Sequence, residues 1–205
     1  MNLLYLDTET TGLSEKAEII QIAGIIEIDG VVKDEFIYNV QCVDYDCIEQ
    51  GALDIHKITV EQIRGFKTPI SVLDELNLRL EFYSMEPYII VGQNPKFDYD
   101  MLSKFWKRHM ATDGRPFKKV ISYRYLDLIN IAGLFHMAGI FNFVDFKLGT
   151  IVNTLGLSFK GNAHNALADI KVTYEAWQYF IRYLQNINPN LTPENIVSKI
   201  PVNQV

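Results

Sequence analysis

Two acidic residues, separated by a single residue, stand directly behind the first apolar segment of the chain. Asp7 and Glu9 follow residues 3–6, which read Leu-Leu-Tyr-Leu. Side chains two positions apart in a β-strand project from the same face, so the two carboxylates are expected about 7 Å apart at the edge of the core. Like charges repel each other in such a poorly solvated place, and a divalent cation relieves the repulsion. In the structural alternative, one acid caps a helix or pairs with an arginine that the fold brings near.

A third acid, Asp98, lies near the start of a predicted helix. The helix is predicted over 97–110, after an apolar strand over 88–91. Asp98 falls on the same side of this helix as Met101 and Phe105, which are expected to face the core. The helix dipole stabilises an acid in the first turn, and this is the structural alternative. A cap alone does not require an acid on the inward side, so the position favours metal binding.

His164 and Asp169 stand at the start of the longest predicted helix, over 165–185. Asp169 lies at the flank of the apolar stripe of this helix. The pattern His-x-Ala-x-x-Asp is more specific than a histidine alone, because its small alanines let the helix pack closely on a sheet. A single histidine is more often packed or exposed than catalytic, and three others occur in the chain without neighbouring chemistry.

Strand ends and helix starts carry all of these acids, and in an α/β sheet such positions converge on one edge. Four carboxylates without a Cys or His ligand pair favour Mg²⁺ or Mn²⁺ over zinc. Two such ions suit phosphodiester hydrolysis, since they activate water and stabilise the transition state. A histidine that titrates near neutrality can accept the proton of that water.

The elements that must position these residues follow an α/β pattern. Asp29-Gly30 predicts a hairpin turn between the second and third of three opening strands. Helices and strands then alternate, which indicates a mixed sheet with helices on its faces. The predicted strands cover 2–7, 18–28, 31–40, 88–91 and 120–126, and the predicted helices cover 71–85, 97–110, 127–137 (capped by Asp127), 147–156 and 165–185.

Length and composition suit one globular domain. The chain has 205 residues, of which 48% are hydrophobic. We expect a catalytic domain over 1–185 and a polar tail over 186–205, with one short helix from Thr192. No segment approaches the roughly 20 apolar residues of a membrane span, and the N-terminus does not read as a signal peptide. Two cysteines without metal or disulfide spacing make the cytoplasm the expected compartment.

The overall charge of −6 and the pI of about 5.2 argue against a nucleic-acid partner. Two observations weaken this objection. Two bound Mg²⁺ ions would change the net charge from −6 to −2. The stretch 96–124 is also rich in cations, which can hold phosphates locally or form an ordinary solvated face. These cations are Lys96, Lys104, Lys107, Arg108, Arg115, Lys118, Lys119 and Arg124.

Three segments, in order, resemble the exonuclease motifs of the DnaQ-like DEDDh 3′→5′ exonucleases: residues 6–13, 92–98 and 164–169. This family includes the polymerase III ε subunit, RNase T, oligoribonuclease and the Trex enzymes. The resemblance spans residues 2 to about 180 and implies an RNase H-like α/β fold with a five-stranded mixed sheet flanked by helices. It also implies two divalent cations, Mg²⁺ or Mn²⁺, with Asp7, Glu9, Asp98 and Asp169 as ligands and His164 as the general base.

The same resemblance implies how a nucleic-acid strand binds. The backbone of residues 9–11 would hold the 3′-terminal nucleotide, Leu13 would wedge against its base, and His56 would approach the strand. The chain departs from the family at Lys57, where glycine is common, and at Gln93, where histidine is frequent. Asp127 resembles a supporting acid of the family. The implied substrate-binding residues are Thr8, Thr10, Thr11, Gly12, Leu13, His56, Asn94 and Phe97.

The expected activity is therefore removal of nucleoside 5′-monophosphates from single-stranded or 3′-overhang nucleic acid. DNA, in proofreading or repair, is the first choice of substrate, and trimming of RNA is the alternative. A polymerase bound in trans through the tail is a candidate partner. A binding module without catalysis would have lost a ligand or the base, yet all five residues are present. A structural protein whose acids are only caps would gain no stability from Mn²⁺.

Overall fold

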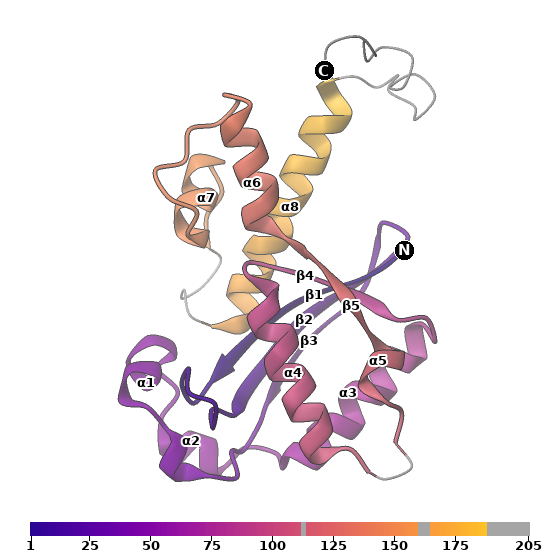
Figure 1. Cartoon of the computed structure of the whole chain (residues 1–205), viewed down its shortest axis with the longest axis vertical. Helices are drawn as coiled ribbons and strands as arrows, with labels where there is room; N and C mark the ends of the chain where they lie inside the picture. Colours follow the sequence, from indigo (N-terminus) through magenta and orange to yellow (C-terminus); the bar gives the residue numbers. More distant parts are fainter. Residues whose placement is uncertain (112–113, 160–164, 188–205) are drawn as a thin grey trace, which may run out of the picture.

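The computed structural model describes residues 1–111, 114–159 and 165–187. Figure 1 shows one sheet with helices on both of its faces, and α1 and α2 lie beyond the end of β1. In chain order the elements are β1 (Asn2–Thr10), β2 (Ile19–Ile28), β3 (Val31–Asn39), the 3₁₀ turn η1 (Tyr45–Cys47), α1 (Gln50–His56), α2 (Val60–Arg64), α3 (Pro69–Tyr83), β4 (Tyr88–Gly92), α4 (Pro95–His109), α5 (Phe117–Val120), β5 (Ile121–Asp127), α6 (Leu128–Met137), α7 (Leu148–Thr154) and α8 (Ala166–Ile187).

The five strands form one mixed sheet in the order β3-β2-β1-β4-β5. β1, β2 and β3 pair antiparallel, whereas β4 runs parallel to both β1 and β5. Asp29 and Gly30 both adopt positive φ angles, of 50° and 78°. Such a pair forms the tight turn that suits the twist of a two-residue hairpin. The α/β fold class and the five-stranded mixed sheet expected from the sequence are confirmed.

Alternation along β1 divides the core into two layers. Leu4 and Leu6 pack with the helices α3, α4 and α5 on one face of the sheet. Leu3 and Tyr5 pack with α6, α7 and α8 on the other face. Asp7 and Glu9 continue the Leu3–Tyr5 series, so the strand directs both acids toward the face that α8 covers.

The carboxyl ends of β1 and β4 lie at the same edge of the sheet because the two strands are parallel. α4 begins immediately after β4, with Asn94 in the left-handed region at φ 54° and Pro95 in the first turn. Proline is suited to this place, since its fixed φ is helical and its missing N–H would have no helical partner. The first turn of α4 is thereby held at the edge where β1 ends.

Several boundaries differ from the sequence prediction. β1 continues beyond residue 7 to Thr10, because residues 7–10 pair with β2. Pro95 begins α4 two residues earlier than predicted, and Thr68 and Pro69 begin α3 two residues earlier. The short helices α1, α2 and α5 were not predicted, since elements of four to seven residues span too few turns to show a periodicity.

The predicted boundary between domain and tail falls inside α8, which continues to Ile187. The predicted short helix from Thr192 lies outside the described residues. The part of the chain that the structure describes contains no helix that is both long and apolar enough to cross a membrane.

Candidate active site

Three carboxylates meet near the carboxyl end of β1, the central strand of the sheet. Asp7 and Glu9 come from β1, and Asp169 comes from the first turn of α8. One oxygen from each lies within 4.8 Å of the other two, and all three residues are half-buried. All of these ligand atoms are oxygens, which hard divalent cations prefer. Two residues of β1, on either side of Thr8, and a residue of a distant helix therefore combine into one group that could hold metal.

Gln21 fixes the start of α8 next to Glu9. It is the cross-strand partner of Glu9 in β2, and its side chain is buried. Gln21 Oε1 accepts a hydrogen bond from the Ala166 N–H at 3.1 Å, while its amide donates to Asn39 at 2.8 Å. Asn165 caps the helix, since its Oδ1 accepts from the Ala168 N–H at 3.3 Å. Neither of these positioning residues was predicted from the sequence.

The fourth predicted ligand, Asp98, reaches the same edge from the opposite face of the sheet. It is a buried side chain in the first turn of α4. Its Oδ1 accepts two hydrogen bonds from Thr8, which stands between Asp7 and Glu9 on β1. The backbone N–H of Thr8 donates at 3.0 Å and its hydroxyl at 2.7 Å.

Asp127 supports the loop that precedes α4. Its Oδ1 accepts from the Asn94 N–H at 3.1 Å and from the Ile129 N–H at 2.9 Å. The second bond caps α6, as the sequence predicted. The first ties the end of β5 to the residue before Pro95, so Asp127 contributes by positioning the start of α4.

Burial and mutual repulsion dominate the electrostatics of the acids. Burial, reinforced by Asp98, Glu9 and Asp169, raises the pKa of Asp7 well above its ordinary value. Burial, together with Asp169 and Asp98, raises the pKa of Glu9 to about 8. Burial also raises the pKa of Asp98 to about 7, against the lowering effect of the Thr8 hydrogen bonds. Without a cation, the group therefore resists full ionisation at neutral pH.

A cavity of about 350 Å³ opens beside Glu9, beyond the end of β1. Of the eight predicted substrate-binding residues, the structure places six around it: Thr8, Thr10, Gly12, Leu13, His56 and Phe97. Leu13 stands at its rim with its side chain 82% exposed. The ring of His56 is buried, and its Nδ1 accepts from the Ile58 N–H at 3.0 Å. An apolar cavity with a few polar groups beside the acids suits a nucleotide.

Two predicted substrate-binding residues do not line this cavity. Thr11 is fully buried, and its hydroxyl accepts from the Glu18 N–H at 2.9 Å. Asn94 is exposed at the start of α4, where its N–H is bonded to Asp127. In the structure both residues shape the surrounding loops.

The unpredicted helix α1 forms another wall of the cavity, with Ala52, Ile55 and the preceding residue Glu49. Glu49 accepts hydrogen bonds from the backbone N–H groups of Leu13 and Ser14, at 3.4 and 3.2 Å. It therefore holds the loop that carries Leu13. A lone exposed acid gives no pattern in the sequence from which this role could be predicted.

A larger cavity, of about 620 Å³, opens on the other side of the acids. Asp7 and Asp169 form part of its wall, together with Gln93, Lys147 and Thr150. Gln93 departs from the family pattern, and its amide donates to the Phe146 carbonyl at 2.8 Å, so here it holds the loop before α7. The carboxylates thus lie between two openings, which allows a chain-like substrate to pass over them.

His164, the predicted general base, lies outside the described residues, and its role stays a prediction. The predicted cationic stretch 96–124 is only partly available for phosphate. Lys96 pairs with Asp100 at 2.5 Å, and Arg108 pairs with Glu18 at 2.5 Å.

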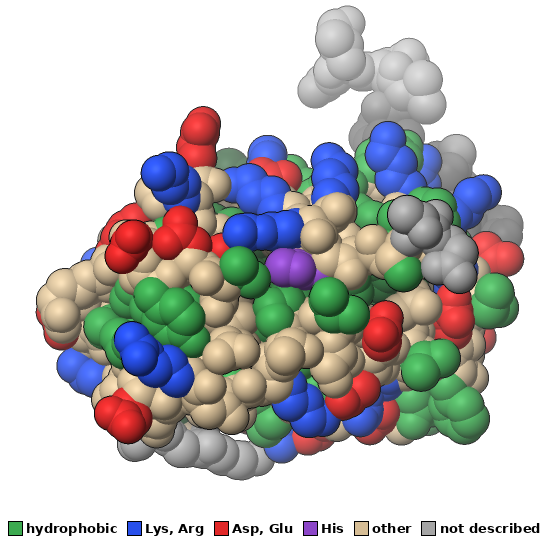
Figure 2. Space-filling model, turned by 90° about the horizontal axis from the view of Figure 1, so that it is seen from below, with side chains coloured by type: hydrophobic (Ala, Val, Ile, Leu, Met, Phe, Trp, Pro, Cys, Tyr) green, Lys and Arg blue, Asp and Glu red, His purple; other side chains and the backbone are tan. Residues whose placement is uncertain are grey.

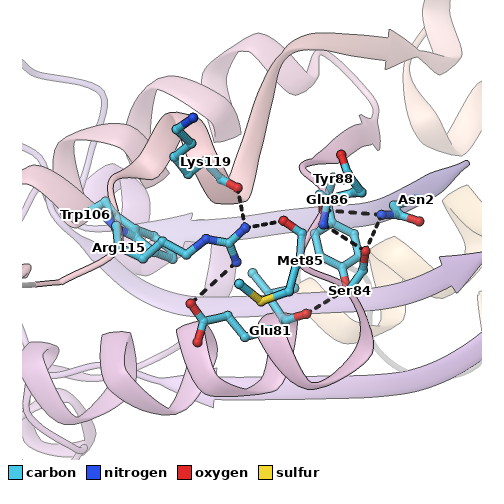
Figure 3. A network of polar contacts seen from close by, with 10 residues as sticks. Asn2, Glu81, Ser84, Met85, Glu86, Tyr88, Trp106, Arg115 and Lys119 are labelled. Carbon is cyan, nitrogen blue, oxygen red and sulfur yellow. Dashed lines mark hydrogen bonds and ion pairs between the residues drawn. The ribbon is translucent and has the colours of Figure 1, made fainter.

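Arg115, a further cation of this stretch, is a structural residue. Figure 3 shows its guanidinium between Glu81 of α3, Met85 in the loop that follows α3, and Lys119 of α5. It donates to the carbonyls of Met85 and Lys119 and pairs with Glu81 at 3.5 Å, and its side chain is only 15% exposed. Its own carbonyl accepts from the Trp106 indole at 2.9 Å. Arg115 therefore joins α3, α4, α5 and the loop that follows α3.

Comparison with solved structures shows the same fold in known nucleases. Exonuclease I of E. coli, solved with a dT13 oligonucleotide, superposes with a TM-score of 0.74 at 20% identity, over 91% of this chain and 42% of that chain. Exonuclease I of Methylocaldum szegediense gives 0.72 at 18% identity, over 90% and 41%. Cell-death related nuclease 4 (CRN-4) gives 0.71 at 19% identity, over 89% and 64%. The chain thus spans about two fifths of the length of the Exonuclease I chains.

No curated protein matches the sequence significantly. The family model described as exonuclease, of the RNase T type, matches residues 4–177. This match includes β1, α4 and the first turns of α8, which carry the four acids described above. The chain therefore belongs to the RNase T-type family of DnaQ-like 3′→5′ exonucleases.

Proposed function

We propose that this protein is a metal-dependent 3′→5′ exonuclease that releases nucleoside 5′-monophosphates from the 3′ end of DNA. The observation that carries the proposal is the group of Asp7, Glu9 and Asp169, whose oxygens lie within 4.8 Å of one another. Three carboxylates held this close strongly favour a bound cation, because, in addition to burial, Glu9 and Asp169 raise the pKa of Asp7 and Asp169 raises the pKa of Glu9.

The residues present fit two hard divalent cations, Mg²⁺ or Mn²⁺. Asp7, Glu9 and Asp169 would hold them, with Asp98 completing the set from α4. When bound, such a pair supplies an activated water and neutralises charge on the phosphate in the transition state. Thr8 positions Asp98 through two hydrogen bonds. The predicted base, His164, would accept the proton of the attacking water.

The cavity beside Glu9 provides the place for the terminal nucleotide. Leu13 and Phe97 offer apolar surface to a base, and the adjacent carboxylates receive the phosphate that follows it. The second opening beside Asp7 gives the remainder of the strand a way out. A strand end is thus favoured over the middle of a strand, since α1 and the Leu13 loop form walls of the first cavity.

DNA is the favoured substrate because Exonuclease I, which shares this fold, was solved with a DNA oligonucleotide. The test compares 5′-labelled DNA and RNA strands of one sequence, each incubated with Mg²⁺ or Mn²⁺. We expect stepwise shortening from the 3′ end, release of nucleoside 5′-monophosphates, and faster loss of the DNA. The Asp7→Asn variant, similar in shape but without the charge, should lose at least about 10³-fold in rate.

Faster degradation of RNA would assign the protein to RNA trimming instead. Degradation of neither strand with either metal would contradict the exonuclease proposal. Equal rates for the wild type and Asp7→Asn would show that a contaminating nuclease produced the shortening.

A further inference from the structure

A basic cavity of about 340 Å³ lies on the far side of the loop that carries Leu13. Residues 15–19 line one side, and the second half of α4 lines the other. Four potentially cationic side chains contribute to it: Lys16, Lys104, Arg108 and His109. Neither the four acids nor the substrate-binding residues described above belong to this cavity.

The buried carboxylate of Glu18 organises one wall. Its two oxygens accept from Arg108 and from the Val43 N–H, each at 2.5 Å. Arg108 is thus held in place and its charge is balanced. Burial, reinforced by Arg108, lowers the pKa of His109, so this ring is neutral at neutral pH.

Lys16 and Lys104 supply the remaining positive charge. Both are exposed, and within the described part of the chain neither has an ion-pair partner. The exposed Glu15 is the other acid at the rim, so the charged side chains around the cavity sum to a net positive charge. Figure 2 views the molecule from below and shows Lys and Arg side chains along much of the upper edge, interspersed with Asp and Glu, and further ones along the lower edge.

The position of the cavity relative to Leu13 suggests its ligand. The Thr11 N–H donates to the Glu18 carbonyl at 2.9 Å, which closes the loop 12–17 at its base. Leu13 on this loop lines the nucleotide cavity beside Glu9, whereas Lys16 lines the basic cavity. One part of this loop therefore lines the cavity proposed for the strand end, and the next part lines a cavity that suits negative charge.

We propose that the basic cavity binds the phosphodiester backbone of the complementary strand when the 3′ end of duplex DNA is degraded. The inference rests on the proposed function. For the terminal nucleotide to enter the cavity beside Glu9, its base pair must open, and the two strands must part at Leu13. The partner strand then passes the outer side of the loop, where Lys16 and Lys104 attract its phosphates without reading its sequence.

The test compares one 5′-labelled DNA strand, alone and annealed as a blunt duplex, for the wild type and for the double variant Lys16→Ala/Lys104→Ala. We expect the rate on the duplex to fall about tenfold, and its dependence on salt to flatten by about one to two units of log–log slope. The rate on the single strand should stay within about twofold, because its terminal nucleotide contacts neither lysine.

Two further variants provide controls. Lys33→Ala/Lys67→Ala removes the same charge from exposed positions outside both cavities and should leave both rates unchanged. Lys16→Arg/Lys104→Arg keeps the charge and should keep the rate on the duplex. Equal melting temperatures of all variants establish that each is folded.

If the double variant lost rate equally on the single strand and the duplex, or on neither, the proposed role of the basic cavity would be overturned. A wild type that degrades the single strand and leaves the duplex intact would also overturn it. Failure to degrade even the single strand would count against the proposed function instead. Binding of the duplex, measured by fluorescence anisotropy without metal, would then still test the basic cavity. Binding that is weaker for Lys16→Ala/Lys104→Ala than for the wild type and the control variants supports the proposal, and equal binding by all of them contradicts it.

Discussion

The backbone N–H and the hydroxyl of Thr8 both donate to the same oxygen of Asp98, at 3.0 and 2.7 Å. These two bonds join β1, the central strand, to α4, which packs on the face of the sheet opposite to α8. Because Thr8 stands between Asp7 and Glu9, the distance between α4 and the other three acids depends on it.

Thr8→Val should reduce kcat about tenfold, because one hydrogen bond to a charged group contributes about 1.5–3 kcal/mol and the backbone bond remains. Activity at saturating single-stranded DNA, measured across a Mn²⁺ titration, checks this. The variant should also need more Mn²⁺, since Asp98 is less well oriented. Thr8→Ser keeps the hydroxyl and should retain most of the activity. A Thr8→Val enzyme with wild-type kcat and metal dependence would refute the positioning role.

The metal-free protein should lose stability as the pH rises from about 4.5 to about 8. Over this range Glu9 is protonated in the folded state, where its pKa is about 8, and ionised in the unfolded chain, where its pKa is 4.5. The unfolded state then binds fewer protons, so raising the pH favours unfolding. Asp98, with a pKa raised to about 7, acts in the same direction.

Thermal melting in EDTA across this range provides the measurement. Burial lowers the pKa of His56 and His109, which makes the opposite contribution near pH 6.5, so the difference between the wild type and Glu9→Gln isolates the Glu9 effect. The variant should melt at a less pH-dependent temperature. Saturating Mg²⁺ or Mn²⁺ should restore stability at pH 8, by about 2.7 kcal/mol at a hundred times Kd. Identical pH profiles of the two proteins would contradict the prediction.

Gly12 leaves room for the carboxylate of Glu49. A Cβ at position 12 would lie 2.2 Å from Glu49 Cδ and 2.4 Å from its Oε1. Gly12→Ala should therefore push the Glu49 side chain away from the N–H groups of Leu13 and Ser14, and the fold should survive because the displaced group is the end of a flexible side chain.

We expect Gly12→Ala to raise KM about three- to tenfold, which corresponds to one or two exposed hydrogen bonds. Glu49→Ala should raise KM similarly, and the double variant should add little to either change, because both act on one interaction. Steady-state kinetics on single-stranded DNA would measure all three. Effects that multiply in the double variant would show that the two residues act independently.

Arg115 should matter for stability and not for the reaction. Arg115→Ala leaves the carbonyls of Met85 and Lys119 without this donor, which should cost about 2 kcal/mol and lower Tm by about 4–8 °C. Arg182→Ala, which removes the same charge from an exposed position on α8, should change Tm little. Loss of activity per folded molecule in Arg115→Ala would indicate a role in phosphate binding.

Local patterns in the sequence determined most of the strands and helices of this protein and the sides on which their residues lie. Alternation placed Asp7 and Glu9 on one side of β1, Asp29-Gly30 closed the first hairpin, and the apolar stripe of α8 put Asp169 at its flank. These features depend on residues a few positions apart, whose relative directions the backbone geometry fixes. The resemblance to exonuclease motifs then indicated that the acids act together.

Only the tertiary structure decided which distant groups meet. Gln21 ties α8 to the strand beside Glu9, Thr8 holds Asp98, and Glu49 anchors the loop of Leu13. Packing of the core also turned Arg115 inward, although its neighbours in the sequence suggested a phosphate-binding surface. Such contacts join segments far apart in the chain, and their geometry follows from how the helices pack on the sheet, which no local periodicity encodes.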